Sequence, residues 1–501
     1  MSKIRIFTVL WETHLPMLDR IKGSLEEEIL INTPRTIEQS GISDEDLLKT
    51  IESCDATIIY RQNSDFSERI RALLYPVKEK LRIINFANDP SLWDLTSVDH
   101  DVAVRTYEYM LTGGDENLGR MIDYVAKTLC GKAGEPLPPM EFPWQAVVSP
   151  EDGEMYESVD GYVKERVKDP DLPFVGVLAS RPALLMDGLI IEKEMCRHLS
   201  ENGLNPLLVF CDWSAKPDFG ALSPSGVVKK FFAHDGKPLV DAIIKMTTTF
   251  IGEDRDPSCK EAIPETAGYL CRMNVPVYQP VMMSEMTVPQ WEESIGLAGD
   301  IAWHISFPEF EGIIDPYVVS SNIEENGNRR RVSVPERMNR LAERIANHVA
   351  LRRKPNSEKR VAIFLNNYPC NGVEANVGNA AGLDSLESIA DLMKRLKEQG
   401  YNVDPPKDGK ELIDTILDRK ALSEFRWTTV QSIAANGGVL HAMDVDEYLR
   451  YFSTLTEKAQ EDVKSTWGEP PGKAMVLNDR ILITGVEFGN VANRPILPPF
   501  M

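Results

Sequence analysis

Short apolar runs of strand length alternate along the chain with segments of helical periodicity, and this alternation limits the possible folds most strongly. Residues 3–10, 57–60 and 81–86 form such runs, with helical patterns at 44–51 and 66–74 between them. Strands that alternate with helices at this spacing predict parallel sheets with helices on both faces. The predicted fold class is therefore α/β, with several doubly wound, largely parallel-sheet domains in one chain.

The length of 501 residues exceeds what one hydrophobic core usually organises, so several domains are expected. We predict an N-terminal α/β domain at 1–134 and a second at 151–352, joined by a proline-rich linker at 135–150. A charged linker at 353–359 then leads to a third α/β unit at 360–501, which is expected to be truncated at its C-terminal end.

Charge and cysteine content restrict the kinds of partner and compartment. The net charge of -22 argues against nonspecific binding to nucleic acid or to an anionic membrane. No apolar run of about 18 residues is present, so no membrane span is predicted, and no signal peptide is recognised. The 7 cysteines are scattered without a Cys-x-x-Cys pair, which favours reduced thiols in a cytoplasmic protein.

The stretch 360–389 has the pattern of a ligand-facing edge in an α/β protein. An apolar strand at 361–365 runs into a loop rich in asparagine and glycine, and a helix follows with Asp384 or Ser385 able to cap it. The glycines match neither a P-loop nor the dinucleotide-binding fingerprint. An ordinary long loop between strand and helix is the alternative interpretation.

Residues 366–389, NNYPCNGVEANVGNAAGLDSLESI, resemble the signature of the large subunits of cobaltochelatase (CobN type) and of magnesium chelatase (H subunit). Segments 113–118, 307–316 and 467–472 are also similar to that family. In the family the chain continues past Gly-Asn-Val into a longer half with a Gly-Thr-His-Gly motif, whereas here ten residues follow Val491. The resemblance thus covers only the N-terminal portion of the family architecture.

The resemblance implies insertion of a divalent metal into a tetrapyrrole, driven by ATP hydrolysed on separate AAA+ ATPase subunits. Co²⁺ insertion into a corrin precursor is favoured, and Mg²⁺ insertion into protoporphyrin comes next. No cofactor is assigned to this chain itself, and a separate C-terminal half of the large subunit is a further expected partner. The rival interpretations are a non-catalytic tetrapyrrole-binding or carrier protein and an enzyme truncated by a frameshift; either way the chain is expected to be inactive alone.

The signature loop supplies most of the expected ligand-binding residues. They are Asn367, Cys370, Gly378, Asn379 and Asp384. The two glycines of the segment Gly-Asn-Ala-x-Gly would allow close backbone approach, and the other side chains would make polar contacts. Asp384 has an alternative role as a simple helix cap. Catalytic residues and metal ligands are not assigned.

Arginines near strand ends are candidates for binding tetrapyrrole carboxylates. Arg61, Arg181 and Arg360 are so placed, although surface ion pairing is the more common use of such residues. The family resemblance also points to the loop expected at 180–187, where Arg181 and Asp187 match the family and its histidine is missing.

A further group of candidates surrounds a histidine. His304, Glu309 and Glu311 could supply nitrogen and carboxylate ligands to a metal or macrocycle. The competing interpretation is a histidine at a sheet edge beside solvated acids. The basic run 329–331 is expected to be a solvated hairpin tip rather than an anion site.

Overall fold

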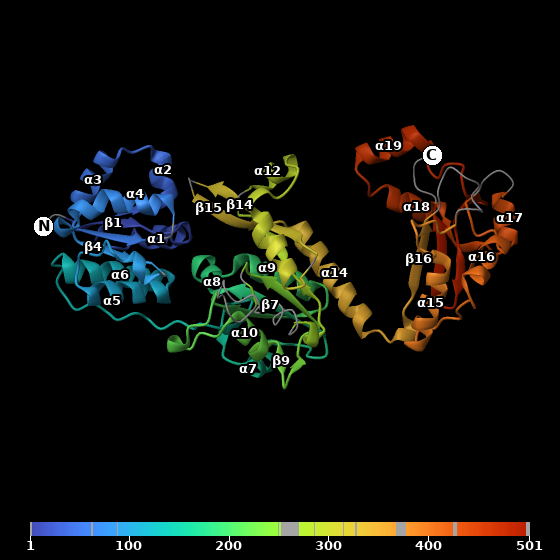
Figure 1. Cartoon of the computed structure of the whole chain (residues 1–501), viewed down its shortest axis with the longest axis horizontal. Coiled ribbons are helices and arrows are strands. Elements are labelled where there is room, and N and C mark those ends of the chain that lie inside the picture. Colours follow the sequence, from blue (N-terminus) through green and yellow to red (C-terminus); the bar gives the residue numbers. More distant parts are fainter. Residues whose placement is uncertain are drawn as a thin grey trace. The chain divides into compact units, whose positions relative to one another are not determined.

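The computed structural model divides into two compact units, Met1–Val349 and Ala350–Met501 (Figure 1). The division into three domains predicted from the sequence remains a prediction. The structure describes residues 3–61, 64–87, 89–248, 250–251, 270–284, 286–313, 315–325, 328–366, 377–423 and 428–496.

The first sheet of unit 1 is parallel throughout, with the strand order β2-β1-β3-β4. Alternate residues of β1 enter separate cores: Ile6 packs among residues of α1, α5 and α6, and Phe7 among residues of α3 and α4. Helices therefore cover both faces, as the alternation predicted. The elements are β1 (Arg5–Val9), α1 (Leu15–Ile21), β2 (Glu28–Asn32), α2 (Pro34–Ser40), α3 (Asp44–Glu52), β3 (Ala56–Tyr60), α4 (Asp65–Leu74), β4 (Ile83–Phe86), α5 (His100–Thr112) and α6 (Gly114–Leu129).

The second sheet of unit 1 has the order β12-β11-β7-β8-β5-β6. The first four strands are parallel, and β5 and β6 extend them in antiparallel pairing. Residues of α9 and α14 pack on one face of the sheet, and residues of α7 and α10 on the other. The elements are β5 (Ala146–Val148), β6 (Met155–Tyr156), α7 (Val159–Arg166), β7 (Phe174–Ser180), α8 (Arg181–Asp187), α9 (Ile190–Glu201), β8 (Asn205–Cys211), α10 (Pro224–Phe231), β11 (Ala242–Met246), β12 (Val277–Tyr278) and α14 (Pro335–Arg353).

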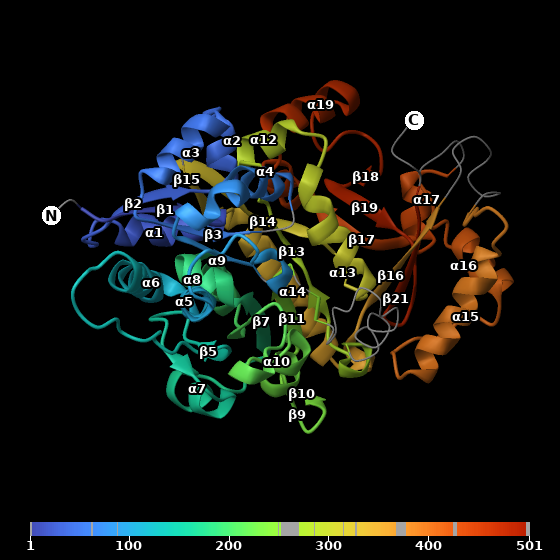
Figure 2. The same cartoon turned by 60° about the vertical axis from the view of Figure 1, so that its left-hand side comes forward.

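Two smaller sheets complete unit 1 (Figure 2). One is the short hairpin of β9 (Ala233–His234) and β10 (Lys237–Pro238). In the other, β13 (Pro280–Met282) pairs in parallel with β14 (Tyr317–Glu325), which forms an antiparallel hairpin with β15 (Asn328–Ser333). The segment between β13 and β14 carries α12 (Val288–Glu293), a π-helical turn at Ala302–Ser306 and α13 (Phe307–Phe310).

Unit 2 contains two three-stranded sheets with helices around them. The predicted strand exists as β16, but of its residues only Leu365 is buried and Phe364 is 58% exposed. Among the described residues it pairs only with β21, in parallel. The elements are β16 (Val361–Asn366), α15 (Ser385–Glu398), α16 (Gly409–Asp418), α17 (Val430–Ala435), β17 (Val439–Asp444), α18 (Val445–Phe452), α19 (Glu457–Trp467), β18 (Val476–Leu477), β19 (Arg480–Thr484), β20 (Val486–Phe488) and β21 (Val491–Ile496).

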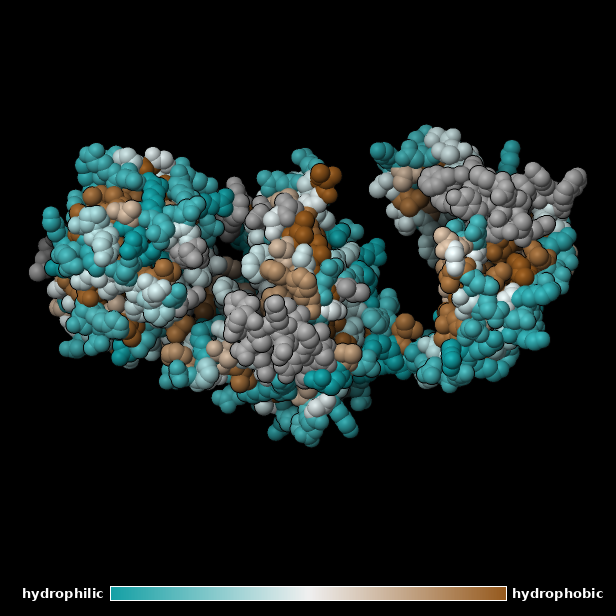
Figure 3. Space-filling model, in the orientation of Figure 1, coloured by the Kyte–Doolittle hydropathy of each residue, from teal (hydrophilic) through white to brown (hydrophobic). Residues whose placement is uncertain are grey.

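The predicted fold class, α/β with several largely parallel sheets, is confirmed. Unit 2 has the least parallel pairing, because β17 and β18 both pair antiparallel with the central strand β19. Much of the face seen in Figure 3 is hydrophilic, which suits a chain in which 26% of residues are charged. No helix among the described residues is long and apolar enough to cross a membrane.

Candidate functional site

The loop expected at 180–187 is a short helix, α8, that begins directly at the carboxyl end of β7. Ser180 caps it by accepting a hydrogen bond from the backbone N–H of Ala183 at 3.3 Å. Pro182 lies in the first turn, where its missing N–H costs nothing, and Gly188 ends the helix with φ of 71°. The expectation of a loop was therefore wrong. The capping serine, the early proline and the terminal glycine are helix signals that the sequence already contained.

Arg181, the first residue of α8, is buried, and its hydrogen bonds join the carboxyl end of β7 to the end of α5 and to the linker before β5. Its guanidinium donates to the main-chain oxygen of Pro143 at 3.0 Å and to those of Leu111 and Thr112 at 3.3 and 2.7 Å. It also lies 4.2 Å from the ring centroid of Trp144. Burial lowers the pKa of Arg181 to about 10, and the charge of Asp212 acts in the opposite direction.

These contacts stabilise the fold, because Leu111 and Thr112 end α5 and their carbonyls lack partners inside that helix. Arg181 is therefore not the surface ion-pair residue that the sequence favoured. Its role as a ligand for a tetrapyrrole carboxylate stays a prediction.

The two other candidate arginines have different surroundings. The Arg61 side chain is only 1% exposed; its Nη1 lies 2.6 Å from Oδ1 of Asp94 and its Nη2 3.4 Å from Oε1 of Glu68. Arg360 is 81% exposed and pairs loosely with Glu487 at 3.6 Å. The expectation of a surface ion pair thus holds for Arg360 and was wrong for Arg61.

An aromatic cluster that was not predicted from the sequence lies at the carboxyl ends of β1 and β3. The rings of Trp11 and Tyr60 stack with centroids 4.4 Å apart, and His14 contacts both. Burial raises the pKa of Tyr60, and the charge of Asp212, which follows β8, adds to the shift. Burial also raises the pKa of Tyr107, and the charge of Asp212 adds to this shift, so the carboxyl ends of both sheets contribute to this region.

His304 lies in the π-helical turn at Ala302–Ser306 and is only 3% exposed. Burial lowers its pKa, while Asp300, itself 2% exposed, acts in the opposite direction. Glu311 is equally buried and its Oε2 lies 2.7 Å from Nζ of Lys245. The interpretation of a sheet-edge histidine beside solvated acids was therefore wrong for His304 and Glu311, which belong to a buried polar cluster.

Of the two candidate acids, Glu309 is exposed to solvent and Glu311 is buried. The neighbouring Trp303 is 51% exposed and makes an edge contact with the ring of Phe307 at 5.1 Å. Within the described part of the chain, no three histidine, cysteine, aspartate or glutamate side chains are grouped to hold a metal ion. Ligand binding by His304 and Glu309 remains a prediction.

Arg331 of the basic run 329–331 is part of a buried ion-pair network. It pairs with Asp187 through two hydrogen bonds of 2.8 and 2.9 Å and with Glu192 through bonds of 3.0 and 3.2 Å. Burial by itself would lower the pKa of Arg331, but the charges of Glu192 and Asp187 outweigh it and raise the pKa. The expectation of a solvated hairpin tip was wrong for this residue, because the hairpin packs on α8 and α9.

Part of the signature loop lies outside the described residues, including the candidates Asn367 and Cys370. Gly378 is buried, with φ of 75°, and a Cβ at this position would come within 2.7 Å of the Ser385 hydroxyl. That hydroxyl donates to the Gly378 carbonyl and so ties the loop to the start of α15. Gly378 is therefore required for the local packing of the loop.

The exposed members of the loop are Asn379 and Asp384. Asp384 is the N-cap of α15, where its Oδ1 accepts from the backbone N–H of Glu387 at 3.1 Å. The predicted capping role is thus confirmed, and its other carboxylate oxygen has no described partner. Gly382 has φ of 76°, and among the described residues, its chain neighbours aside, no atom lies within 4 Å of the point that a Cβ would occupy there.

The candidate residues fall into two groups. Gly378, Asn379 and Asp384 lie together at the carboxyl end of β16 in unit 2. The other three, Arg181, His304 and Glu309, lie in unit 1, where no described hydrogen bond or ion pair joins Arg181 to the other two. The arrangement supports a polar, ligand-accessible loop after β16 in unit 2.

These features define an α/β protein with several largely parallel sheets and a polar loop at a strand end, the usual place for a ligand in such folds. The family model described as CobN/Magnesium Chelatase matches residues 107–494. The chain belongs to this family, as the signature segment predicted.

Two relatives and one solved structure illustrate the similarity. An uncharacterized protein of Methanocaldococcus jannaschii is 32% identical over 502 residues, which are 97% of this chain and 39% of that protein. The aerobic cobaltochelatase subunit CobN of Pseudomonas aeruginosa is 27% identical over 428 residues, 83% of this chain and 31% of that protein. The catalytic subunit of cobaltochelatase from Mycobacterium tuberculosis has the same fold over 99% of this chain and 39% of that one, with a TM-score of 0.64 and 21% identity.

The chain therefore spans between about a third and two fifths of the length of these relatives. This partial coverage fits the prediction that the chain corresponds to the N-terminal portion of the family architecture.

Proposed function

We propose that this chain is the tetrapyrrole-binding, N-terminal part of the large subunit of an ATP-dependent metal chelatase. The observation that carries the proposal is the continuous family match over residues 107–494, which includes the signature loop on β16. Insertion of cobalt into a corrin precursor is the favoured reaction, since the curated relative from Pseudomonas aeruginosa is named as a cobaltochelatase subunit. Insertion of magnesium into protoporphyrin is the second choice.

The chemistry of the loop supports binding of a polar, flat macrocycle. Such a ligand needs backbone that a ring can approach closely, and Gly382 provides it because its surroundings are open. It also needs hydrogen-bonding groups that are accessible, and the exposed Asn379 and Asp384 flank that glycine. Asp384 can keep one oxygen on the helix cap while the other meets a ligand donor.

The remaining parts of the reaction are assigned to other components. Removal of two pyrrole protons needs a base, and we propose that another component of the complex supplies it. Hydrolysis of ATP is assigned to AAA+ ATPase partners, and the metal enters as substrate. We propose that the complex works in the cytoplasm.

Substitutions in the loop test this proposal. Asn379→Ala removes an exposed amide, and Asp384→Ser keeps a capping oxygen while it removes the second carboxylate oxygen. We expect the affinity for a soluble metal-free porphyrin, measured by quenching of tryptophan fluorescence, to fall several-fold in each variant while thermal stability is unchanged. Unchanged affinity in both variants at unchanged stability would place the binding surface elsewhere.

Asp408→Ser is the matched control. Asp408 caps α16 in the same way, accepting from the backbone N–H of Glu411 at 2.9 Å, but it lies outside the signature loop. Loss of a helix cap alone would change the porphyrin affinity of the two aspartate variants equally. A ligand contact would weaken porphyrin binding only in the Asp384 variant.

A further inference from the structure

Two consecutive helices of unit 2, α18 and α19, leave most of their apolar side chains uncovered, and we call residues 445–467 the α18–α19 arm. α18 buries only Phe452, and none of the residues of α19, all of which are described, is buried. Figure 1 shows α19 at the end of unit 2 opposite to α15. The large apolar side chains of the arm that are between 39 and 62% exposed are Leu449, Tyr451, Leu455 and Trp467.

The apolar residues of α19 form one face that has no cover in unit 2. Ala459, Val463 and Trp467 follow one another at intervals of four residues, so they lie on the same side of the helix. The described hydrogen bonds and ion pairs of its side chains involve only residues 455–469. A helix of 11 residues is marginal in water without tertiary packing, so this face is expected to pack on another surface.

The lengths of the related proteins indicate which surface this is. The Mycobacterium tuberculosis subunit has the same fold over 99% of this chain, yet the match covers only 39% of that subunit. The Methanocaldococcus jannaschii relative is likewise covered over 39% of its length. In both, a fold like that of unit 2 belongs to a polypeptide of which about three fifths lies outside the match. That remainder is a partner large enough to cover the arm.

Charge distinguishes this partner from a second copy of the chain. Each copy has a net charge of -22, so two copies repel each other. Residues 445–467 contain five acidic and three basic side chains, which gives the arm a net charge of -2. One of the bases, Lys464, lies 3.5 Å from Glu469. A groove with an apolar floor and basic residues along its edge therefore complements the arm.

We propose that the α18–α19 arm docks into such a groove on a separate polypeptide, equivalent to the part of the large subunit that the matches leave uncovered. This inference rests on the proposed function, since a chelatase large subunit is what supplies that polypeptide. It adds the surface of this chain that makes the contact, which is distinct from the signature loop after β16.

The test measures binding to a defined probe by isothermal titration calorimetry. The probe is the purified part of the Methanocaldococcus jannaschii relative that lies outside the match, and the matched part of the same relative is the positive control. We expect saturable one-to-one binding of the probe by the full chain. The double variant Leu455→Glu/Trp467→Glu should bind it at least ten-fold more weakly, because two charges then enter the apolar contact.

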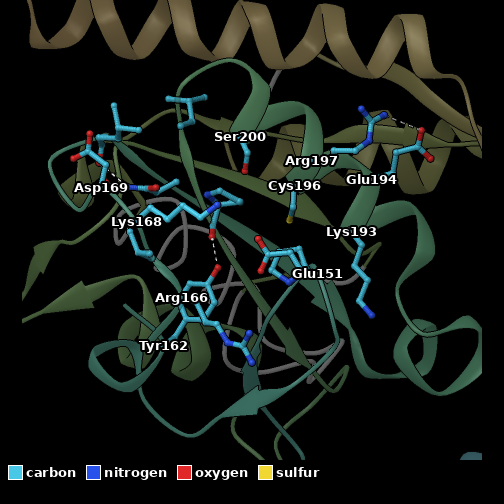
Figure 4. A pocket seen from close by; sticks show the side chains of 16 residues that line it. Glu151, Tyr162, Arg166, Lys168, Asp169, Lys193, Glu194, Cys196, Arg197 and Ser200 are labelled. Atoms are coloured by element: carbon cyan, nitrogen blue, oxygen red, sulfur yellow. Dashed lines mark hydrogen bonds and ion pairs between the residues drawn. The ribbon is translucent and has the colours of Figure 1, made fainter. Parts of the chain in front are cut away.

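The matched control, Ser200→Glu/Leu392→Glu, introduces the same two charges outside the arm. Leu392 of α15 is 46% exposed, close to the 43% of Leu455. Ser200 is an exposed residue of α9 at the wall of a cavity of about 560 Å³ in unit 1 (Figure 4). This variant should bind the probe within two-fold of the unaltered chain. Circular dichroism and thermal melting check that both double variants are folded.

No saturable binding by this chain, when the positive control binds the probe, would overturn the proposal. Unchanged affinity in the folded arm variant would do so too, as would an equal loss in the control variant. A dimer of the unaltered chain that the arm substitutions abolish would assign the arm to a second copy and equally overturn it. Porphyrin affinity should be the same in the arm variant and the unaltered chain, so a failure of docking is distinguishable from a failure of the tetrapyrrole proposal.

Discussion

Nζ of Lys245 lies 2.7 Å from Oε2 of Glu311, and both side chains are at most 2% exposed. Glu311 also accepts from the backbone N–H of Ile251 at 2.5 Å. The pair thus joins β11 to the segment after α13 inside the core of unit 1, next to the buried His304.

Glu311→Gln is expected to destabilise unit 1 by about 3–5 kcal/mol, because the buried ammonium of Lys245 loses the nearby negative charge of Glu311. The double variant Lys245→Met/Glu311→Leu removes both charges and should cost less than the single change. Urea unfolding followed by fluorescence measures both. As a control, Asp414→Asn breaks an exposed pair with Lys410 and should cost less than about 1 kcal/mol. Equal losses of unfolding free energy in all three variants would contradict the assignment of Lys245 and Glu311 as a stabilising buried pair.

Arg331 should be far less tolerant of substitution than a surface arginine. Arg331→Gln leaves Glu192, which is 0% exposed, without its partner, and we expect a loss of about 3 kcal/mol or more. Arg331→Lys keeps the charge but cannot form the two-pronged contact with Asp187, so an intermediate loss is expected. Arg340→Gln, at a pair in which the arginine is 63% exposed, should cost under about 1 kcal/mol. Thermal melts that rank these variants in any other order would show that the network is not stabilising.

The two glycines of the signature segment should differ in their response to alanine. Gly382→Ala puts a methyl group into open space and carries only the cost of a left-handed backbone, about 1–2 kcal/mol. Gly378→Ala has the same backbone cost and also displaces the Ser385 hydroxyl, which adds about 1–3 kcal/mol. Guanidinium unfolding of the two variants checks the difference, and equal losses would mean that Gly378 is not closely packed.

His14 should make unit 1 less stable in mild acid. Burial lowers its pKa to about 4 from 6.5, and its Nδ1 is shielded from solvent without a described partner. The unfolded chain binds this proton between pH 6.5 and 4 and the folded chain does not, so stability is complete above pH 6.5 and falls as the pH decreases toward 4. The loss from this residue is at most about 3 kcal/mol.

Comparison with His14→Phe isolates the contribution of this histidine. Urea unfolding between about pH 4 and 7.5 should show a steeper loss of stability in the unaltered chain than in the variant. Identical slopes would mean that His14 titrates normally in the folded protein.

Local signals in the sequence were sufficient for much of the fold. The strands at 3–10 and 57–60 and the helix capped by Asp384 follow from periodicity and capping chemistry, which depend on neighbours in the sequence. The strand β2 was missed because acids precede it; one of them, Glu27, is buried against Lys132 at 2.6 Å. No local pattern identifies such a distant partner.

The surroundings of the candidate residues were much less predictable. Arg331 was expected in solvent, yet its partner Asp187 lies 144 positions away in the sequence. Likewise, the burial of Arg181 follows from carbonyls at the end of α5. The aromatic cluster around Trp11 and Tyr60 has a signal in retrospect, since both residues lie at the carboxyl end of a predicted strand.

The most direct test of the central claim is an equilibrium titration of the unaltered chain with metal-free tetrapyrroles. A corrin-type ring and a soluble porphyrin are added separately, and tryptophan quenching and ring absorbance are recorded together. We predict saturable binding with one ring per chain, tighter for the corrin-type ring than for the porphyrin. Absence of saturable binding for both rings, in a chain shown to be folded, would contradict it.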